Sequence, residues 1–443
     1  MASTTKWFVW ASALSLVEIG LLFSQSEVRR IGYASQFYLA VVCFVVYSSS
    51  CVVEQVSTEM YDLGYFKTSP KVCWLARLAL AVVTMFLAPM CIVVIGVNRH
   101  IVGINPSFFT MLFYICFGFT FHLLTITWTM NSLARVIRFI YRCLIQEKGP
   151  LIEQTVRSQH NFAQLKALLG FIYAFFISFY GVYYAFQPPI IRKVHIPIEN
   201  LSKSFDGFRI VQLCDIHLGP TVGKEQLEEV IDAVQKLHPD LIVITGDLVD
   251  GHVQDLMDAV EPAKHLQAPY GKFFVSGNHE YLTRDVDNWF RHLRTLGFGI
   301  LHNDNTKIKK PDSSDEFCLA GVDDHDATNY KGHGMDLDKA VSTCDPKYPI
   351  ILLAHQPNAA KMALESNGKK QKLILDFTIS GHTHGGQMFP GSILVYLVNT
   401  YYAGLYKVGK SNYVYVSEGA IYWGIPMRIL STKEITEIVL QAS

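Results

Sequence analysis

The 443-residue sequence has no excess of charge of either sign and no repeated or low-complexity tract. Its 38 Lys and Arg side chains balance its 38 Asp and Glu side chains, and charged residues make up only 17% of the chain. A basic surface for nucleic acid is therefore not indicated. Because half of the residues are hydrophobic, the composition also excludes a disordered chain.

Cysteine is scarce in the second half of the sequence. Six of the nine cysteines precede residue 150, which leaves Cys214, Cys318 and Cys344. An odd number of cysteines on expected strands and loops does not predict a disulfide framework, so cysteine does not indicate the redox compartment. Cys214 is expected to point into the core, as free cysteine usually does.

Long apolar runs are concentrated in the first 190 residues. Each is close to the ~20 residues with which a helix crosses ~30 Å of hydrocarbon, so we expect an all-α transmembrane bundle at 1–190. The five expected helices are 7–23, 37–53, 74–97, 108–130 and 165–186. Core helices of a soluble protein are the alternative, but Trp and Tyr near the run ends favour a membrane. Glu18 interrupts the first run and no clear cleavage site follows, which favours a retained helix over a signal peptide.

Lys and Arg are shared unevenly between the two sides of this expected bundle. One side would hold Lys6, Lys67, Lys71, Arg135, Arg138, Arg142, Lys148 and Arg157. The other side would hold Arg29, Arg30, Arg99, Arg192 and Lys193. The richer side is expected to face the cytoplasm, which places the second half outside the cell or in a lumen. Asn200-Leu201-Ser202 is a glycosylation acceptor sequence that agrees with this side.

Two ionisable residues, Glu18 and His122, lie inside expected spans, where such groups are candidates for function or for packing. Gln187-Pro188-Pro189 is expected to end the last span, because proline cannot continue a helix. The second half would then begin close to the membrane.

Five polar stretches in the second half each follow an apolar run that is typical of a buried central strand. The runs are 209–214, 241–245, 272–276, 350–353 and 377–380. The stretches are Asp215-Ile216-His217, Gly246-Asp247-Leu248-Val249-Asp250, Gly277-Asn278-His279-Glu280, Ala354-His355-Gln356-Pro357 and Gly381-His382-Thr383-His384. The carboxyl ends of neighbouring strands meet at one edge of a sheet, so the five stretches predict one site. Their carboxylates, amide and imidazoles, without a thiolate, suit divalent metal ions. Each stretch taken alone is also compatible with a polar turn.

In this order the stretches resemble the motifs of the calcineurin-like metallophosphoesterase superfamily. Those motifs are Asp-x-His, Gly-Asp-x-x-Asp, Gly-Asn-His-Glu, a lone His and Gly-His-x-His. The resemblance covers roughly residues 195–430 and implies that 195–443 is a catalytic domain, a two-sheet β sandwich flanked by helices. The residue pattern alone predicts only an α/β domain with mixed sheets.

The resemblance implies a site for two divalent metal ions. One ion would take Asp215, His217, Asp247 and His384, and the other would take Asp247, Asn278, His355 and His382. Oxygen and imidazole ligands accept manganese, iron or zinc, so the metal is not distinguished. Two ions that share a carboxylate generate hydroxide near neutral pH, the nucleophile for attack on phosphorus.

The resemblance also implies two catalytic residues. His279 would face the substrate, where it can stabilise the transition state or protonate the leaving oxygen. Asp250 would orient His279, with a plain helix or loop cap as the alternative. Glu280 either completes the motif or only supports its loop.

Three further segments carry weaker indications. The polar segment 323–333 is interpreted as a solvated loop, with a pocket-shaping loop as the alternative. Arg428 is a candidate phosphate contact, since arginine pairs well with phosphate. Residues 434–440 are expected to form a closing strand, and 226–237, 286–296 and 336–344 are expected to form helices.

The sequence therefore predicts a membrane-anchored hydrolase of phosphate monoesters or diesters. Closeness to the bilayer favours a lipid-linked substrate, on topology and family analogy alone. A non-catalytic metal-binding sensor or scaffold is the alternative, although a structural metal would not need His279 and Asp250. A transporter is a third hypothesis, disfavoured because the spans lack paired charges. The sequence does not indicate an oligomeric state.

Overall fold

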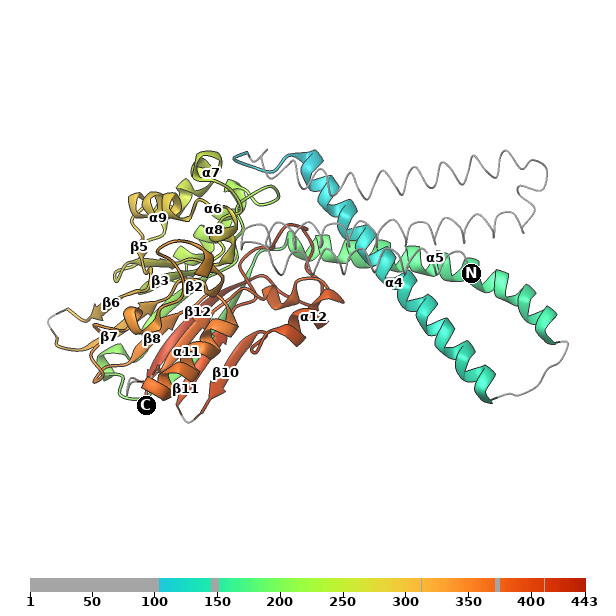
Figure 1. Cartoon of the computed structure of the whole chain (residues 1–443). Helices are drawn as coiled ribbons and strands as arrows, with labels where there is room; N and C mark the ends of the chain where they lie inside the picture. The colour runs from blue at the N-terminus through green and yellow to red at the C-terminus, as the bar shows by residue number, and fades with distance from the viewer. Residues whose placement is uncertain (1–102, 145–150, 312, 371–374, 410) are drawn as a thin grey trace. The chain divides into compact units, whose positions relative to one another are not determined.

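The computed structural model describes residues 103–144, 151–311, 313–370, 375–409 and 411–443 (Figure 1). The chain divides into two compact units. The helical unit includes the described residues 119–144 and 151–175, and the sheet unit includes the described residues of 103–118 and 176–443. The expected spans 7–23, 37–53 and 74–97 lie outside the described residues.

Two long helices, α4 (Phe108–Leu144) and α5 (Leu151–Ala185), include almost all of the other two expected spans, although α4 continues beyond residue 130 and α5 begins before residue 165. By length and composition, Phe108–Ile137 and Leu168–Ala185 could each cross a membrane. The helix α5 ends just before Gln187-Pro188-Pro189, as the prolines predict.

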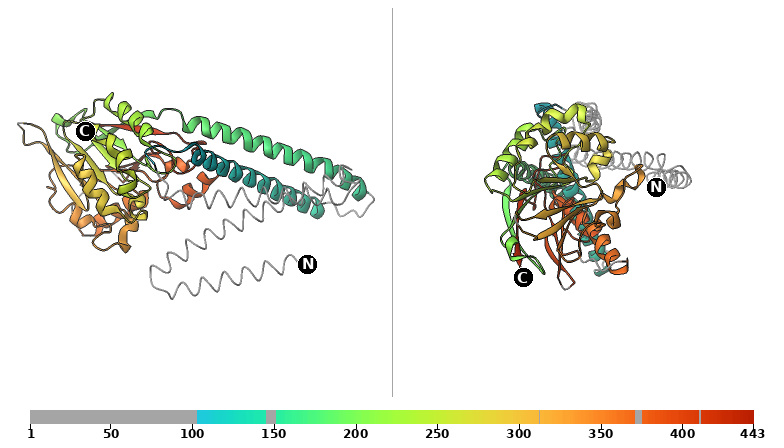
Figure 2. Two further views of the ribbon diagram at one scale, coloured as in Figure 1. Left: turned by 90° about the horizontal axis from the view of Figure 1, so that it is seen from above. Right: turned by 90° about the vertical axis from the view of Figure 1, so that its left-hand side faces the viewer.

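Within the helical unit, α4 and α5 pack against one another (Figure 2). Lys166 Nζ donates a hydrogen bond to Asn131 Oδ1 at 2.8 Å, and the ring centroids of Phe119 and Phe171 lie 5.6 Å apart. His122 on α4 is fully buried. Among the residues that the structure describes, this contact therefore includes both an aromatic pair and a polar pair.

The sheet unit contains two mixed six-stranded sheets. The first has the order β1-β12-β2-β3-β4-β5 and the second the order β10-β11-β9-β8-β7-β6. The first sheet consists of β1 (Ile190–Ile198), β2 (Arg209–Leu213), β3 (Leu241–Thr245), β4 (Lys272–Val275), β5 (Gly299–Ile300) and β12 (Glu434–Ala442). The second sheet consists of β6 (Asp304–Lys309), β7 (Glu316–Gly321), β8 (Ile350–Leu353), β9 (Phe377–Ser380), β10 (Gly404–Val408) and β11 (Asn412–Val416). The predicted α/β domain with mixed sheets is confirmed, and the expected strands are shifted by at most a few residues.

The sheets pack face to face, and helices cover their outer faces. In β3, Leu241 and Val243 join the core between the sheets, while Ile242 and Ile244 join the core beneath the helices. Alternate side chains point to opposite faces of a strand, so a central strand covered on both sides is apolar throughout.

The helices beside the two sheets are short, and Figure 1 shows those of the first sheet grouped on one side. The first sheet carries α6 (Lys224–Gln235), α7 (Val253–Val260), α8 (Asn278–Leu282) and α9 (Val286–Thr295). The second carries α10 (Leu337–Ala340) and α11 (Pro357–Lys370), while α12 (Gly391–Val398) belongs to the same unit but buries none of its residues against the described parts of the chain. The expected helix at 336–344 is reduced to the four residues of α10.

A disulfide joins Cys318 on β7 to Cys344, with the two Cα atoms 5.7 Å apart. The sequence interpretation that these cysteines form no disulfide is therefore wrong. The third cysteine of this half, Cys214, is free and buried in the core, where its thiol lies 3.1 Å from the Thr245 carbonyl oxygen. The expectation for Cys214 is confirmed.

Candidate metal centre

The seven predicted metal ligands lie together at the carboxyl ends of strands that belong to the two sheets. Asp215, His217, Asp247 and Asn278 follow β2, β3 and β4 of the first sheet, and His355, His382 and His384 follow β8 and β9 of the second. We expected the edge of a single sheet. The ligands instead come from both sheets, which lets them surround a site from two directions.

The first predicted ligand set converges on one point. His217 Nε2 lies 2.9 Å from His384 Nε2 and 3.7 Å from Asp247 Oδ2. His384 Nε2 lies 3.6 Å from Asp215 Oδ1. Atoms that bind one ion at ~2.1 Å are separated by about 3.0–3.5 Å. The spacing of these four side chains therefore fits a divalent metal ion.

The second predicted set converges around His355. Its Nε2 lies 3.2 Å from both Asp247 Oδ2 and Asn278 Oδ1, and 3.3 Å from His382 Nδ1. Its Nδ1 lies 2.8 Å from the Thr245 carbonyl oxygen, which can only accept, so Nε2 keeps its lone pair for a metal. Asp247 Oδ2 borders both sets, the position of a carboxylate shared by two ions.

The backbone is strained at five of these ligands. Asp215, His217, Asp247, His382 and His384 all have φ between 53° and 73°. Side chains other than glycine rarely adopt this left-handed region, and such residues concentrate at functional sites. The strain turns each ligand sharply inward at the end of its strand.

Burial and neighbouring charges set the ionisation of the ligands. Burial, together with His355, lowers the pKa of His382 to about 3. Burial and His217 lower the pKa of His384 well below its usual range. Burial raises the pKa of Asp247, but the charges of His355 and other histidines outweigh it and hold that pKa well below its usual range. The arrangement favours neutral imidazoles at His382 and His384 and an ionised carboxylate at Asp247, the forms that bind metal. For His355, burial lowers the pKa, but the charge of Asp247 outweighs it and holds that pKa well above its usual range.

Asp250 contacts two histidines with one oxygen atom. Its Oδ1 lies 2.9 Å from His217 Nδ1 and 2.7 Å from His279 Nδ1. Burial raises the pKa of Asp250, but the two histidines outweigh it and hold that pKa well below its usual range. The sequence predicted contact with His279 but missed the contact with His217. Asp250 therefore orients a predicted ligand as well as the predicted acid.

His279 presents its second ring nitrogen to the site. Nε2 lies 4.0 Å from Asp247 Oδ2, while Nδ1 is held by Asp250. Burial lowers the pKa of His279, but the charges of Asp247 and Asp250 outweigh it and raise it to about 9. The two carboxylates thus favour the protonated form of this imidazole.

Glu280 holds two of the ligand loops together. Its buried carboxylate accepts hydrogen bonds from the amides of Gly277 at 2.7 Å, Asp247 at 3.0 Å and Leu248 at 2.8 Å. A Cβ atom at Gly277 would lie 2.2 Å from Asp247 Oδ1, so this approach requires glycine. Of the two roles considered for Glu280, support of the loop is confirmed.

Comparison with known proteins decides the family. The model of the calcineurin-like phosphoesterases matches residues 208–386. The chain is 36% identical over 416 residues to a transmembrane protein with metallophosphoesterase domain from Danio rerio, covering 93% of this chain and 91% of the relative. The chain belongs to the calcineurin-like metallophosphoesterases.

Two further relatives are similar to this metallophosphoesterase over smaller parts of its length. A transmembrane protein with metallophosphoesterase domain from Bos taurus is 40% identical over 349 residues, 77% of this chain and 76% of the relative. The uncharacterized metallophosphoesterase YkuE of Bacillus subtilis is 30% identical over 272 residues, 60% of this chain and 90% of the relative. The family binds a dinuclear metal centre, and the His and Asp clusters described above are candidate ligands for it.

Trp423 lies at the metallophosphoesterase site, where the sequence gave no reason to expect it. Its ring centroid lies 5.3 Å from that of His279 and 6.3 Å from that of His217, and the side chain is 52% exposed. Gln387 fixes this loop, because its Oε1 accepts from the Trp423 amide at 2.7 Å and its Nε2 donates to the Ile425 carbonyl oxygen at 3.1 Å. The loop after β11 thus forms one wall of the site.

Arg428 is buried against the predicted ligand His384 and is not exposed to a substrate, so its prediction as a phosphate contact is wrong. The side chain is buried, and its guanidinium donates to the carbonyl oxygens of His384 and Ile421 at 2.5 and 2.6 Å. A buried cation gains more from these carbonyl groups than from remaining unpaired. Arg428 therefore fixes the backbone of a predicted ligand.

The segment 323–333 is not a solvated loop, which corrects that interpretation. Asp323 and Asp324 are buried, and residues His325–Asn329 form a short 3-10 helix, η3. Asp323 Oδ1 lies 2.6 Å from His302 Nδ1, and Asp324 Oδ1 accepts from Gln356 Nε2 at 2.9 Å. The segment packs behind the loop that carries His355.

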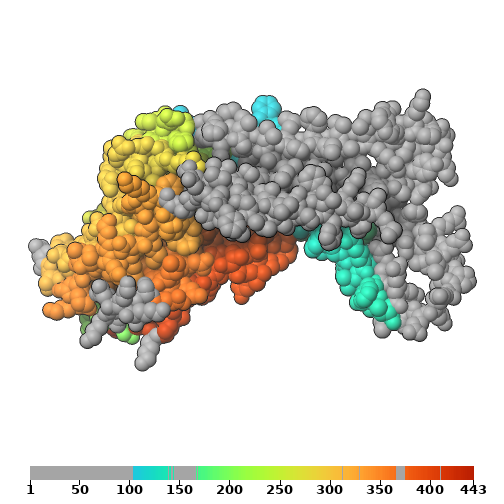
Figure 3. Space-filling model, viewed as in Figure 1, coloured from blue at the N-terminus to red at the C-terminus, as the bar shows by residue number. Residues whose placement is uncertain are grey.

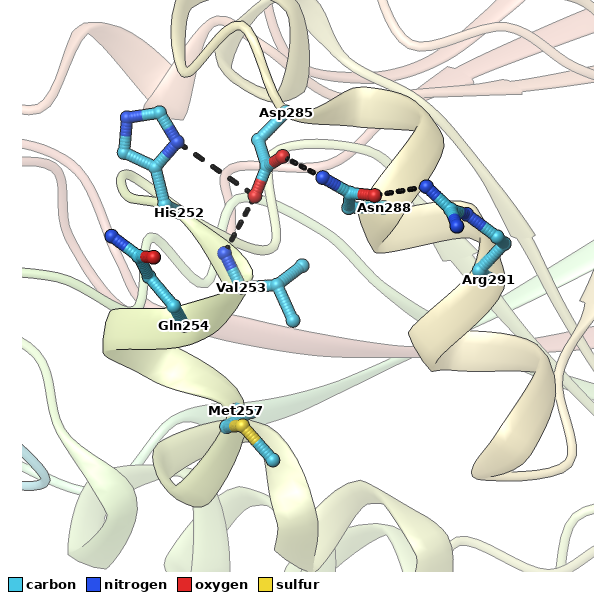
Figure 4. A pocket seen from close by; sticks show the side chains of 7 residues that line it. All are labelled: His252, Val253, Gln254, Met257, Asp285, Asn288 and Arg291. Carbon is cyan, nitrogen blue, oxygen red and sulfur yellow. Dashed lines mark hydrogen bonds and ion pairs between the residues drawn. The ribbon is translucent and has the colours of Figure 1, made fainter.

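A separate surface pocket lies between the start of α7 and α9 (Figure 4). It is lined by His252, Val253, Gln254, Met257, Asp285, Asn288 and Arg291. Asp285 Oδ2 accepts from the Val253 amide at 2.8 Å, so the carboxylate already caps α7. None of the predicted site residues lines this pocket.

Proposed function

We propose that this metallophosphoesterase is a membrane-anchored phosphate-ester hydrolase whose dinuclear site is formed by the seven predicted ligands. The observation that carries the proposal is the convergence of two donor sets on Asp247 Oδ2, with His279 and Asp250 beside them. The sensor alternative is disfavoured because an oriented, charged His279 serves no structural metal.

The donor sets fit the metal ions of the family, since they combine carboxylate, amide and imidazole groups. Asp215, His217, Asp247 and His384 would hold one ion, and Asp247, Asn278, His355 and His382 the other. Two ions held there would supply Lewis acidity and lower the pKa of water.

His279 is the residue of the chain that would act on the leaving group. Asp250 occupies Nδ1, so the proton that can move lies on Nε2, which faces the site. The raised pKa keeps this proton in place near neutral pH. His279 would donate it to the departing oxygen, and Trp423 would cover one side of the substrate.

We place the sheet unit on the extracytoplasmic side of a multi-pass protein. The Cys318–Cys344 disulfide supports this side, since disulfides persist in oxidising compartments. Asn200 of the glycosylation sequence is exposed just after β1, where it would be accessible for modification. The name of the Danio rerio relative supports the membrane anchor.

The substrate would be a phosphate ester carried by a lipid. Only four residues separate Ala185, the end of α5, from Ile190, the start of β1, so the first strand of the sheet unit begins just after an apolar helix. A site tethered so closely to a bilayer meets lipid head groups more often than soluble esters.

The test uses the full chain, because β1 begins at Ile190 and a truncation at 195 would remove half of an outer strand. The protein would be stripped of metal and refilled with manganese, iron or zinc. Bound metal would be counted, and hydrolysis of a generic monoester and a generic diester would be measured. His279→Ala and Asp247→Asn are compared with His265→Ala, an exposed histidine on the 3-10 helix η2 (Glu261–His265).

We expect metal-dependent turnover, lost in His279→Ala and Asp247→Asn and retained in His265→Ala. His279→Ala should keep its metal, whereas Asp247→Asn should bind less. Two bound metal ions without turnover of either ester or of a lipid phosphate would contradict the proposal and favour the metal-binding sensor.

A further inference from the structure

The short helix α12 exposes almost all of its apolar side chains. Its sequence Gly-Ser-Ile-Leu-Val-Tyr-Leu-Val carries no charge, and no residue in it is buried among the parts of the chain that the structure describes. The exposed side chains, between 53% and 71% accessible, are Ile393, Leu394, Tyr396, Leu397 and Val398. An uncharged apolar surface of this kind marks an interaction site in a soluble domain.

The segment that leads into α12 is joined to the end of α5 through one short strip of chain, residues 428–430. Ile429 pairs with Met388, and the Phe389 amide donates to the Ile429 carbonyl oxygen at 3.3 Å. On the other side, the Arg428 amide donates to the Gly181 carbonyl oxygen at 2.9 Å. A Cβ atom at Gly181 would lie 2.8 Å from Ile429, so helix and strip are in close contact.

The end of α5 exposes large apolar rings of its own. Phe176, Phe179 and Tyr183 are between 54% and 66% accessible, and they lie in the apolar window that could cross a membrane. Leu430, on the same strip, is 73% accessible. The exposed apolar side chains therefore continue from α5 across the strip toward α12. In Figure 3 the segments coloured orange to red, which include α12, form one continuous part of the surface.

The same helix is attached directly to the metal site. Ser392 packs against Gly386, where an added Cβ would lie 2.4 Å from Ser392 Cβ. Gly386 ends the 3-10 helix η4 (His384–Gly386), which begins with a predicted ligand. Tyr402, in ring contact with Tyr396 at 5.6 Å, donates to the Gly385 carbonyl oxygen. A displacement of α12 would therefore be transmitted to His384.

We propose that α12 inserts into the acyl-chain region of the phospholipid leaflet at which α5 enters the bilayer. This inference rests on the membrane anchor and on the lipid-linked substrate proposed above. A bilayer is the occupant that the structure favours, because the apolar surface of α12 continues that of a helix with membrane composition. The insertion brings the edge of the metal site to the level of the head groups, so that a lipid phosphate reaches it by lateral diffusion.

The test labels the native full chain in nanodiscs of phosphatidylcholine that contains a diazirine in its acyl chain. After photolysis, the labelled peptides are located by mass spectrometry. We expect label on residues 391–398 and on 176–186, at severalfold the level found on α7. Met257 makes α7 a suitable internal control, since it is an exposed apolar residue outside the two apolar windows that could cross a membrane. Leu394→Glu with Leu397→Glu should lower the label on 391–398 by more than half without changing that on 176–186.

Label on 176–186 but not on 391–398 would overturn the insertion while leaving the anchor intact. Absence of label from both segments would contradict the anchor itself, and the insertion with it. A crosslink of α12 to a second copy of the chain, or to residues 1–102, in place of lipid would show that protein covers the helix and would also overturn the proposal. Leu394→Gln with Leu397→Gln repeats the comparison without introducing charge.

Discussion

At the scale of single residues, the site depends on one oxygen atom that serves two histidines. Asp250 Oδ1 fixes the ring of His217, a predicted ligand, and that of His279, the predicted acid. Groups that orient metal ligands change affinity or activity by about 10–100-fold when they are removed. The carboxylate should therefore affect metal retention and turnover together.

Asp250→Asn is expected to lower turnover by about 10–100-fold and to weaken metal binding, because the amide keeps the shape but loses the charge. Turnover and bound metal would be measured on the same preparation. Asp255→Asn, at an exposed position on α7, is the matched control. Equal metal content and turnover in the two variants would show that Asp250 only caps its loop.

Asp376, away from the metal site, should make stability depend on pH. Burial raises the pKa of Asp376 to about 6. The Ile350 amide, which donates a hydrogen bond to Oδ2 at 2.8 Å, lowers this pKa but does not outweigh burial. A carboxyl group whose pKa is higher in the folded chain stabilises the fold most below its unfolded pKa, and this contribution is lost as pH rises through about 6.

The amide side chain of Asp376→Asn does not titrate, whereas the native chain loses stability as Asp376 ionises. The free energy of unfolding of the variant, relative to that of the native chain, should therefore rise by up to about 3 kcal/mol between pH 4 and pH 7. Unfolding would be followed at both pH values for the native chain, for this variant and for Asp255→Asn. A difference between Asp376→Asn and the native chain that is constant with pH would contradict the assigned pKa.

At the scale of elements, the site is an assembly of loops held at strand ends. Glu280 joins the loops after β3 and β4 through four backbone amides. Glu280→Ala would leave these buried donors without an acceptor, which costs about 1–3 kcal/mol for each group that stays unpaired. We expect the free energy of unfolding to fall by about 3 kcal/mol or more, with loss of bound metal.

Two comparisons separate this effect from a general loss of helix stability. Glu280→Gln retains one acceptor oxygen and should lose less stability than Glu280→Ala. Glu228→Ala, at an exposed position on α6, should leave stability within experimental error of the native chain. Chemical denaturation of the three variants measures this order, and equal stability of Glu280→Ala and Glu228→Ala would refute the role.

The sequence predicted the elements whose residues carry a local signal. The strands β2, β3, β8 and β9 are mostly apolar and almost entirely buried, and their ends are marked by polar motifs, so strands and candidate ligands were both identified. Trp423 and Arg428 approach His279 and His384 through a loop distant in sequence, and no local pattern reports such a contact. The start of β1 was missed because Ile190 and Ile191 continue the apolar composition of the preceding helix.

The disulfide was missed for a similar reason. Cys318 and Cys344 are brought together only when β7 pairs with β8, which places residue 318 beside Ile350. The spacing along the chain does not show this pairing. The odd number of cysteines did not exclude a disulfide, because Cys214 is a free cysteine buried in the core.

At the scale of the whole molecule, the disulfide reports the compartment in which the sheet unit folds. Cys318→Ala with Cys344→Ala should lower the free energy of unfolding by about 3 kcal/mol, since the loop closed by the bond is lost. Alkylation of the native chain from membranes, without reduction, should leave residues 318 and 344 unmodified and linked. After denaturation, Cys214 should be modified and serves as the internal control. Modification of both Cys318 and Cys344 before reduction would place the unit in a reducing compartment.

The position of β12 has a consequence for the order of events during synthesis. This strand follows all the others in the sequence, yet it lies between β1 and β2 in the first sheet. Until it has been made, β1 has no partner and the ligand-bearing strand β2 has an open edge, the condition under which strands associate with other chains. The site can therefore take its final form only after the whole sheet unit has left the ribosome. A premature stop before Glu434 would spare every predicted ligand and still leave the first sheet divided, so such a product is expected to aggregate or be degraded before it binds metal.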